Sequence, residues 1–234
     1  MIWLYEITPS IQGEGKHAQT DIVIVRTMTC NLKCQASEGG FDCDTYYTWK
    51  KGSMAKGMFL TGEEAHKRIL EAAKHNGAKT IMLTGGEPLV WQNDRDFQTM
   101  LKLSRDSGFS IDVETNGTLD PTVGSNFIDF FVISPKASQY SNRYNRDITS
   151  KYKQTNHIWK FVVSSPHDVG NLAEFLKQKG IGIEEEIWLM PEGNTPEKLD
   201  EHLADFDMYE SLLTSMGYFN VYVSDRLQIR GRYA

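Results

Sequence analysis

Short apolar runs rich in Val, Ile and Phe alternate along this sequence with longer segments of helical patterning. Strands that alternate with helices form mostly parallel sheets, because each parallel pair needs a long crossover connection. The sequence therefore predicts an α/β fold whose sheet is flat or curved into a barrel. The runs predicted as strands are 21–27, 80–83, 110–114, 127–133, 158–163 and 186–190. The segments predicted as helices are 61–76, 94–107, 166–179 and 195–216, the first opened by the capping-box pair Thr61 and Glu64.

The chain of 234 residues is long enough to bury a proper core, and we expect a single domain over 1–234. Residues 137–156 are polar and rich in Tyr and Asn. We expect this stretch to be a loop excursion from the domain, either a mobile lid or an ordinary surface loop.

The formal net charge of −6 argues against a broad electrostatic grip on nucleic acid and favours a small-molecule substrate. The first ten residues show no basic segment followed by a long apolar one. No run approaches the ~18 apolar residues that a membrane helix needs. We therefore expect a cytoplasmic protein with no membrane partner and no direct nucleic-acid partner. Three arginines near the C-terminus, Arg226, Arg230 and Arg232, could close over a substrate carboxylate, but we expect them to form a solvated basic tail.

The only cysteines of the chain, Cys30, Cys34 and Cys43, fall in one short stretch directly after the strand predicted at 21–27. Three thiols cannot all pair as disulfides, and a closed structural zinc site normally needs four nitrogen or sulfur ligands. Three thiolates on a four-iron cluster would leave one iron free to bind another ligand. The spacing alone leaves two other interpretations open: ordinary free cysteines, and a zinc site completed by a distant histidine such as His157.

Polar and glycine-rich motifs follow other predicted strands at the point where each strand ends. They occupy residues 84–87, 114–116 and 134–136. Because α/β proteins bind ligands at the carboxyl ends of their strands, these loops are expected to meet the cysteine segment on one face. Each motif taken alone is also typical of an ordinary turn.

Several motifs, taken together and in order, carry a family resemblance. They are SIQGEG at 10–15, Arg26, CNLKC at 30–34, CDTYYTW at 43–49, TGGEP at 84–88, ETNGT at 114–118, ISPK at 133–136 and, more weakly, WLMPEG at 188–193. In combination they resemble the radical S-adenosylmethionine (SAM) enzymes, and within them the family of 7-carboxy-7-deazaguanine synthases. The resemblance implies a partial (β/α) barrel of about six parallel strands.

The resemblance implies a [4Fe-4S] cluster held by Cys30, Cys34 and Cys43. The usual spacing in the family is C-x3-C-x2-C, whereas eight residues separate Cys34 from Cys43 here. We still expect Cys43 to be the third ligand, because relatives carry the same Asp-Thr-Tyr directly after their third cysteine. Gly39 and Gly40 can let the enlarged loop fold back.

The resemblance also implies SAM and Mg2+ as cofactors. The glycines of TGGEP would let the backbone approach the methionine portion of SAM, Glu87 would accept from its ammonium group, and the SPK motif would lie near the adenosyl end. Thr45 is implied as the protein ligand of a Mg2+ ion that bridges to the substrate. The residues implied in SAM binding are Asp42, Asp44, Gly85, Gly86, Glu87, Ser134, Pro135 and Lys136.

The implied reaction is the radical ring contraction of 6-carboxy-5,6,7,8-tetrahydropterin to 7-carboxy-7-deazaguanine with loss of ammonia. An amide and a carboxylate can read the edge of a pterin, and arginine can clamp a carboxylate with two parallel hydrogen bonds. The residues implied in substrate binding are Ile11, Gln12, Gly13, Glu14, Arg26, Thr84 and Glu114. No side chain is expected to act as a nucleophile.

The implied partners are an electron donor such as flavodoxin or ferredoxin and, by family analogy, a second copy of the chain in a homodimer. The product would enter either a modified transfer RNA base or a DNA modification, and the sequence does not choose between them. Two alternatives remain: another radical SAM enzyme such as a glycyl-radical activase, and a zinc-binding interaction module.

Overall fold

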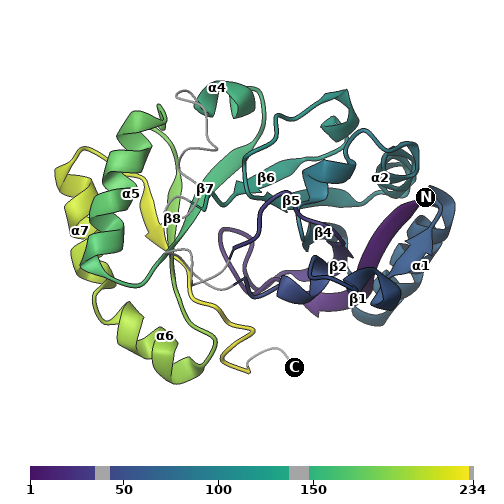
Figure 1. Ribbon diagram of the computed structural model, residues 1–234, viewed down its shortest axis with the longest axis horizontal. Helices are drawn as coiled ribbons and strands as arrows, with labels where there is room; N and C mark the ends of the chain where they lie inside the picture. Colours follow the sequence, from purple (N-terminus) through teal and green to yellow (C-terminus); the bar gives the residue numbers. More distant parts are fainter. Residues whose placement is uncertain (35–42, 137–147, 232–234) are drawn as a thin grey trace. The chain divides into compact units, whose positions relative to one another are not determined.

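The computed structural model describes residues 1–34, 43–136 and 148–231, and Figure 1 shows its elements. The chain packs as two compact units, and each is described by itself. The first unit comprises residues 1–12, 19–33 and 43–132, and the second includes residues 13–18, Cys34 and the chain from Ile133 onward. The expectation of one domain over 1–234 stays a prediction.

The first unit is built on a sheet with the strand order β3-β1-β2-β4-β5-β6. Its neighbours β2, β4 and β5 run parallel, as predicted from their apolar runs. Strands that are covered on both faces read as nearly continuous apolar segments, and this is why the sequence pattern found them. The four predicted strands of this unit are β2 (Asp21–Thr27), β4 (Thr80–Gly85), β5 (Ser110–Thr115) and β6 (Phe130–Ile133).

The sequence pattern missed two strands that extend this sheet, β1 (Ile2–Ile11) and β3 (Met58–Leu60). Both pair antiparallel, β1 with β2 and β3 with β1. Along β1 only Ile2 and Leu4 are buried, and the apolar pattern is interrupted by Glu6 and by the segment Thr8, Pro9 and Ser10.

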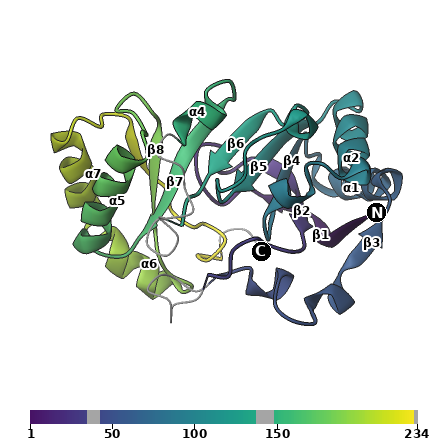
Figure 2. The same cartoon turned by 45° about the horizontal axis from the view of Figure 1, so that its top comes forward.

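Two helices of the first unit begin with the caps that their sequences provide. The capping box predicted at Thr61 opens α1 (Gly62–Asn76): its Oγ1 accepts from the backbone N of Glu64 at 3.2 Å, and the Glu64 carboxylate accepts from the backbone N of Thr61 at 2.8 Å. The carboxylate of Asp94 caps α2 (Arg95–Asp106). Figure 2 shows the two helices side by side.

The second unit contains three neighbouring parallel strands, with helices before and between them (Figure 1). The strands are β7 (His157–Val163), β8 (Ile187–Pro191) and the short β9 (Val221–Val223), which the sequence pattern missed. The helices are α4 (Thr149–Tyr152), α5 (Pro166–Gln178), α6 (Pro196–Leu203) and α7 (Phe206–Ser215). None of the described helices combines the length and the apolar character that crossing a bilayer requires.

The single helix predicted at 195–216 is wrong, because the structure has two helices there. Ala204 and Asp205 form a turn between α6 and α7, and Asp205 lies at the N-cap position of the second helix. Aspartate is in general favoured at caps and turns, but the Asp205 side chain makes no capping hydrogen bond here.

Of the predicted loop excursion at 137–156, residues 137–147 lie outside the described residues. The remainder carries α4, and both Ile148 and Tyr152 are fully buried in the second unit. The ring of Tyr152 packs edge-on against Trp159 of β7 with centroids 6.1 Å apart. The described end of this segment is therefore anchored in a core.

A histidine–carboxylate pair joins the start of β7 to the loop before β8. Nε2 of His157 lies 2.9 Å from the carboxylate of Glu185, which also accepts from Trp159 Nε1 at 2.9 Å. Burial lowers the pKa of His157, but the bonds to Glu185 and to the Thr155 carbonyl, with the Glu185 charge, raise it overall. Burial likewise raises the pKa of Glu185, but hydrogen bonds from His157 and Trp159 hold it below its ordinary value.

We predict that this pair stabilises the fold most strongly in mildly acidic solution. The contribution of His157 is complete below its ordinary pKa of 6.5 and is lost as the pH rises through the raised value. The contribution of Glu185 is present above 4.5 and is lost as the pH falls through the lowered value. Urea unfolding of the parent and of His157→Gln should therefore differ more at about pH 5.5 than at about pH 8.5. An equal difference at both pH values would contradict this account.

Candidate functional site

The loop that carries Cys30 is held by the glycine turn that follows β4. The backbone N of Gly86 donates to the carbonyl of Thr27 at 3.0 Å, and the backbone N of Glu87 donates to the carbonyl of Thr29 at 2.9 Å. A Cβ atom on Gly86 would overlap that Thr29 carbonyl. The glycine is therefore required, because it lets two backbones approach where any side chain would separate them.

Cys43 and Thr45 border the same turn. Thr45 Oγ1 donates to the carbonyl of Gly85 at 2.8 Å and lies 3.4 Å from Cys43 Sγ. Trp49, just after the 3₁₀ helix η2 (Tyr46–Thr48), donates its indole N–H to Cys43 Sγ at 3.3 Å. The first unit thus brings the predicted ligands Cys30 and Cys43 to the TGGEP turn.

Cys30 also receives hydrogen bonds at its sulfur. The backbone N of Leu32 donates at 3.4 Å, and Nδ2 of Asn116 donates over a longer 3.9 Å. Nitrogen donors that point at a sulfur favour its thiolate form and tune a cluster bound to it.

Glu87 is fully buried and binds groups of the protein itself. Its carboxylate accepts from the backbone N of Leu89 at 3.0 Å, from Thr115 Oγ1 at 2.8 Å and from the backbone N of Asn116 at 2.7 Å. Glu87 therefore ties the turn after β4 to the end of β5 and positions the amide that approaches Cys30. Its role at the ammonium group of SAM stays a prediction.

Thr29, directly before Cys30, is held in an unfavourable state. Its φ of 71° is left-handed, which is rare for a branched side chain. Its Oγ1 is buried without a hydrogen-bond partner, a property that it shares, among the described residues, only with Tyr209 Oη. Strain and an unpaired buried hydroxyl concentrate at functional sites, and here both lie beside a predicted cluster ligand.

The donor set fits a thiolate-bound iron–sulfur cluster. All three cysteines are thiols rather than disulfides, and two of them receive N–H donors at sulfur. Within the described ranges no three His, Cys, Asp or Glu side chains converge as a metal site, so the meeting of Cys34 with Cys30 and Cys43 stays a prediction. The zinc alternative through His157 gains no support, because its Nε2 is bound to Glu185.

Arg26 and Thr84 lie opposite each other on the parallel strands β2 and β4. Nε of Arg26 donates to Glu6 at 2.5 Å, which leaves the two terminal amino groups available, within the described chain, for another carboxylate. Glu114 lies half-buried near the end of β5. The first unit therefore places a guanidinium and a hydroxyl residue next to each other, and their roles in substrate binding stay predictions.

The structure does not bring Ile11 and Gln12 to that position. Ile11 pairs with Asp21 at the opposite end of the β1–β2 hairpin from Arg26, five residues or roughly 16 Å along β2. Gln12 continues the hairpin, with its backbone N donating to the carbonyl of Thr20 at 2.8 Å.

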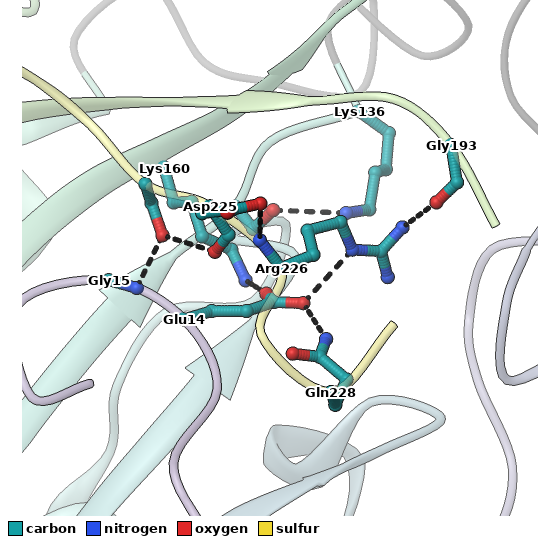
Figure 3. Close-up of polar contacts among 10 residues, drawn as sticks. Glu14, Gly15, Lys136, Lys160, Gly193, Asp225, Arg226 and Gln228 are labelled. Carbon is teal, nitrogen blue, oxygen red and sulfur yellow. Dashed lines mark hydrogen bonds and ion pairs between the residues drawn. The ribbon is translucent and has the colours of Figure 1, made fainter. Parts of the chain in front are cut away.

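Glu14 is the centre of a buried ionic cluster in the second unit (Figure 3). Its carboxylate accepts from Lys160 Nζ at 2.8 Å, from Arg226 Nε at 3.1 Å and from the Gln228 amide. Lys160 and Arg226 are only 2% and 8% exposed. Burial raises the pKa of Glu14, but the charges of Lys160 and Arg226 and the bonds from Lys160 and Gln228 bring it down to about 2.

The expected solvated basic tail is wrong for the two of its arginines that the structure describes. Arg226 Nη1 donates to the carbonyl of Gly193 at 2.8 Å, and Arg230 forms ion pairs with Asp225 at 2.5 Å and with Asp200 at 2.8 Å. Nearby acidic and carbonyl oxygens thus hold both side chains. Arg232 lies outside the described residues.

The other residues predicted to bind SAM lie in two separate parts of the chain, around Cys43 and directly after β6. Ser134 is buried and its Oγ accepts from Lys136 Nζ at 3.0 Å, beside Pro135 in the second unit. Asp44 is exposed, next to Cys43, and Asp42 lies outside the described residues.

Sequence reasoning missed Trp49, Asn116 and Lys160 as site residues, and it considered Arg226 only as a residue that could close over a substrate carboxylate. The first two belong to the quoted motifs CDTYYTW and ETNGT, yet nothing in a motif says that a side chain points at sulfur. Lys160 did carry a signal, because a lysine within the strand HIWKFVV is buried only when it is paired.

Comparison with known proteins agrees with this geometry. Residues 11–157 match the family described as "4Fe-4S single cluster domain". A 7-carboxy-7-deazaguanine synthase of Pyrobaculum aerophilum is 32% identical over 85% of this chain and 82% of its own, and one of Rhodopirellula baltica is 30% identical over 94% and 82%. The crystal structure of QueE from Escherichia coli superimposes with a TM-score of 0.64 at 20% identity, covering 97% of this chain and 94% of that one, so the fold is a radical SAM partial barrel.

We predict that Gly86→Ala weakens both the fold and cluster assembly. The new methyl group would overlap the Thr29 carbonyl, and overpacking of this kind costs about 1–3 kcal/mol of unfolding free energy. Denaturant unfolding and iron content after reconstitution would measure the two effects. The control is Gly170→Ala in α5, where a Cβ atom meets nothing within 4 Å and stability should be kept or raised. Equal behaviour of the two variants would contradict the close approach.

We predict that Glu14→Gln lowers the unfolding free energy by about 3 kcal/mol, because two buried cations lose their countercharge. The low pKa of Glu14 means that the parent keeps this stabilisation above pH 4.5 and loses it as the pH falls toward about 2. Urea unfolding at neutral pH measures the loss. Lys16→Met is the control, since it breaks an exposed pair with Glu186 and should cost less than about 1 kcal/mol. A similar loss in both variants would count against the cluster.

Proposed function

The chain belongs to the 7-carboxy-7-deazaguanine synthase family of radical SAM enzymes, and we propose that it converts 6-carboxy-5,6,7,8-tetrahydropterin to 7-carboxy-7-deazaguanine with loss of ammonia. This makes it a carbon–nitrogen lyase of deazapurine biosynthesis. The observation that carries the proposal is the identity of about a third to relatives with this activity over most of both chains. The packing of the Cys30 and Cys43 loops on the TGGEP turn supports it independently.

The three cysteines are proposed to hold a [4Fe-4S] cluster with one iron left open. When bound, such a cluster supplies the single electron and the open coordination position that reductive cleavage of SAM requires. The chain fixes the direction of two ligands: the Gly86–Thr27 and Glu87–Thr29 hydrogen bonds hold the Cys30 loop, and Thr45 anchors Cys43 to Gly85.

The TGGEP turn is proposed to receive the methionine portion of SAM. Its glycines present backbone without side chains beside the Cys30 loop. Glu87 is already fixed by three hydrogen bonds, so its proposed contribution is a rigid negative charge near the ammonium group. Ser134, Pro135 and Lys136 are proposed for the adenosyl end, with Asp42 and Asp44 flanking the third cysteine.

Arg26 is proposed to clamp the substrate carboxylate. Its Nε–H is held by Glu6, so the guanidinium plane is fixed before substrate binds. Thr84 lies opposite it on β4, and Glu114 is proposed for the same pocket. Thr45 is proposed as the Mg2+ ligand: its hydroxyl proton goes to Gly85, which leaves an oxygen lone pair for the ion.

Ile11, Gln12, Gly13 and Glu14 are proposed for the end of the pterin away from its carboxylate, because Ile11 lies roughly 16 Å along the hairpin from Arg26. Glu14 is deprotonated across the physiological range, and Lys160 and Arg226 hold its carboxylate in place. A substrate amide or amine that approached it would meet an acceptor that needs no reorganisation.

The proposed enzyme would depend on an electron donor, and its product would be used by other enzymes. A flavodoxin or ferredoxin would supply the electron, the chain would act in the cytoplasm, and two copies would associate as a homodimer. The product would feed a modified base of transfer RNA or of DNA.

We predict that the reconstituted protein makes 7-carboxy-7-deazaguanine from the tetrahydropterin under anaerobic conditions with SAM, Mg2+ and a reductant. Cys43→Ala should make none, because a cluster ligand is lost. Product analysis by liquid chromatography with mass detection measures both. Trp188→Phe, a substitution outside the proposed site, is the control and should retain turnover.

Two results would redirect the proposal. A parent that builds a cluster and cleaves SAM in stoichiometric amounts only with a protein partner would favour a glycyl-radical activase. Turnover by Cys43→Ala would instead remove Cys43 from the ligand set.

A further inference from the structure

The sulfur of Cys43 has a side-chain donor that no motif assigns. Trp49 Nε1 donates to Cys43 Sγ at 3.3 Å. Thr45 Oγ1 is also near, at 3.4 Å, but its one proton is already committed to the Gly85 carbonyl at 2.8 Å. The indole N–H is therefore the side-chain donor that the described residues direct at this sulfur.

The local fold holds the indole in that orientation. Backbone hydrogen bonds from Thr48 to Thr45 at 2.9 Å and from Trp49 to Tyr46 at 3.2 Å form a tight turn after Cys43. The ring of Tyr46 packs edge-on against Trp49 with centroids 4.8 Å apart and an interplanar angle of 88°. The donor is thus held by both backbone and ring packing, and needs no reorganisation when a cluster binds.

We infer that the indole N–H of Trp49 donates a hydrogen bond to the cluster-bound thiolate of Cys43 and raises the reduction potential of the cluster. Reduction adds an electron and makes the sulfur ligands more negative, so a donor at sulfur stabilises the reduced cluster more than the oxidised one. Trp49 is a positioning residue in this sense, because it acts on the reacting centre through Cys43. The inference rests on the proposed function, since it requires a cluster at Cys43.

The test is the reduction potential of Trp49→Phe, which removes the N–H and keeps an aromatic ring against Tyr46. We expect the potential to become more negative, with the ratio of reduced to oxidised cluster at a fixed potential falling about tenfold, equivalent to 59 mV for a one-electron couple. Dithionite titration followed by electron paramagnetic resonance (EPR) measures this, normalised to iron content.

Trp188→Phe is the matched control. It makes the same substitution and also removes an indole hydrogen bond, which runs to Glu186 at 2.8 Å. Its potential should equal that of the parent. A Trp49→Phe potential equal to the parent, or an equal shift in both variants, would overturn the inference.

A second measurement needs no substitution and decides the question if Trp49→Phe fails to fold. Protein labelled with 15N at the tryptophan indole should show a 15N hyperfine coupling in pulsed EPR of the reduced cluster. The other indole donors with described partners, Trp91, Trp159 and Trp188, bind oxygen atoms. Absence of the coupling in a parent that carries a reduced cluster would overturn the inference. A parent with no cluster signal would overturn the proposed function as well.

Discussion

Two backbone hydrogen bonds between the turn after β4 and the loop after β2 are the constraint on which the candidate site depends. The Gly86–Thr27 and Glu87–Thr29 bonds bring two main chains together where a single Cβ atom would not fit. The consequence reaches three elements: Cys30 is oriented by its loop, Thr45 anchors Cys43 to the same turn, and Glu87 carries the connection to the end of β5. One local contact thus organises loops from different parts of the chain.

The interaction has a cost that the fold tolerates. Thr29 adopts a left-handed backbone and buries a hydroxyl without a partner, and each such feature disfavours the folded state by about 1–3 kcal/mol. The left-handed backbone and the unpaired hydroxyl of Thr29 persist because the surrounding hydrogen bonds hold this conformation. In the second unit the cost is the burial of two cations. The carboxylate of Glu14 and the groups around it offset that cost, because they pair with Lys160 and Arg226.

The parallel strands could be predicted because strands covered on both faces leave a nearly continuous apolar signal. β1 was missed because polar residues and Pro9 interrupt its apolar pattern. The turn at Asp205 was missed because a polar residue is also expected on the solvent face of an amphipathic helix. For the site, motifs located the glycine turn and the cysteines. The motifs could not show that the Glu87 carboxylate accepts hydrogen bonds from the protein itself or that Glu14 pairs with Lys160. Both contacts join residues that are far apart in sequence.

The eight-residue spacing between Cys34 and Cys43 bears on the proposal that both cysteines bind one cluster. On its C-terminal side, Cys43 is held by the Thr45 bond to Gly85 and by the indole of Trp49. Lengthening a loop from two to eight residues costs about 1.2 kcal/mol of closure entropy, since each doubling adds about 0.6. That cost is comparable to one or two hydrogen bonds of the kind that anchor Cys43. The wide spacing is therefore compatible with the proposed role of Cys43 as the third ligand.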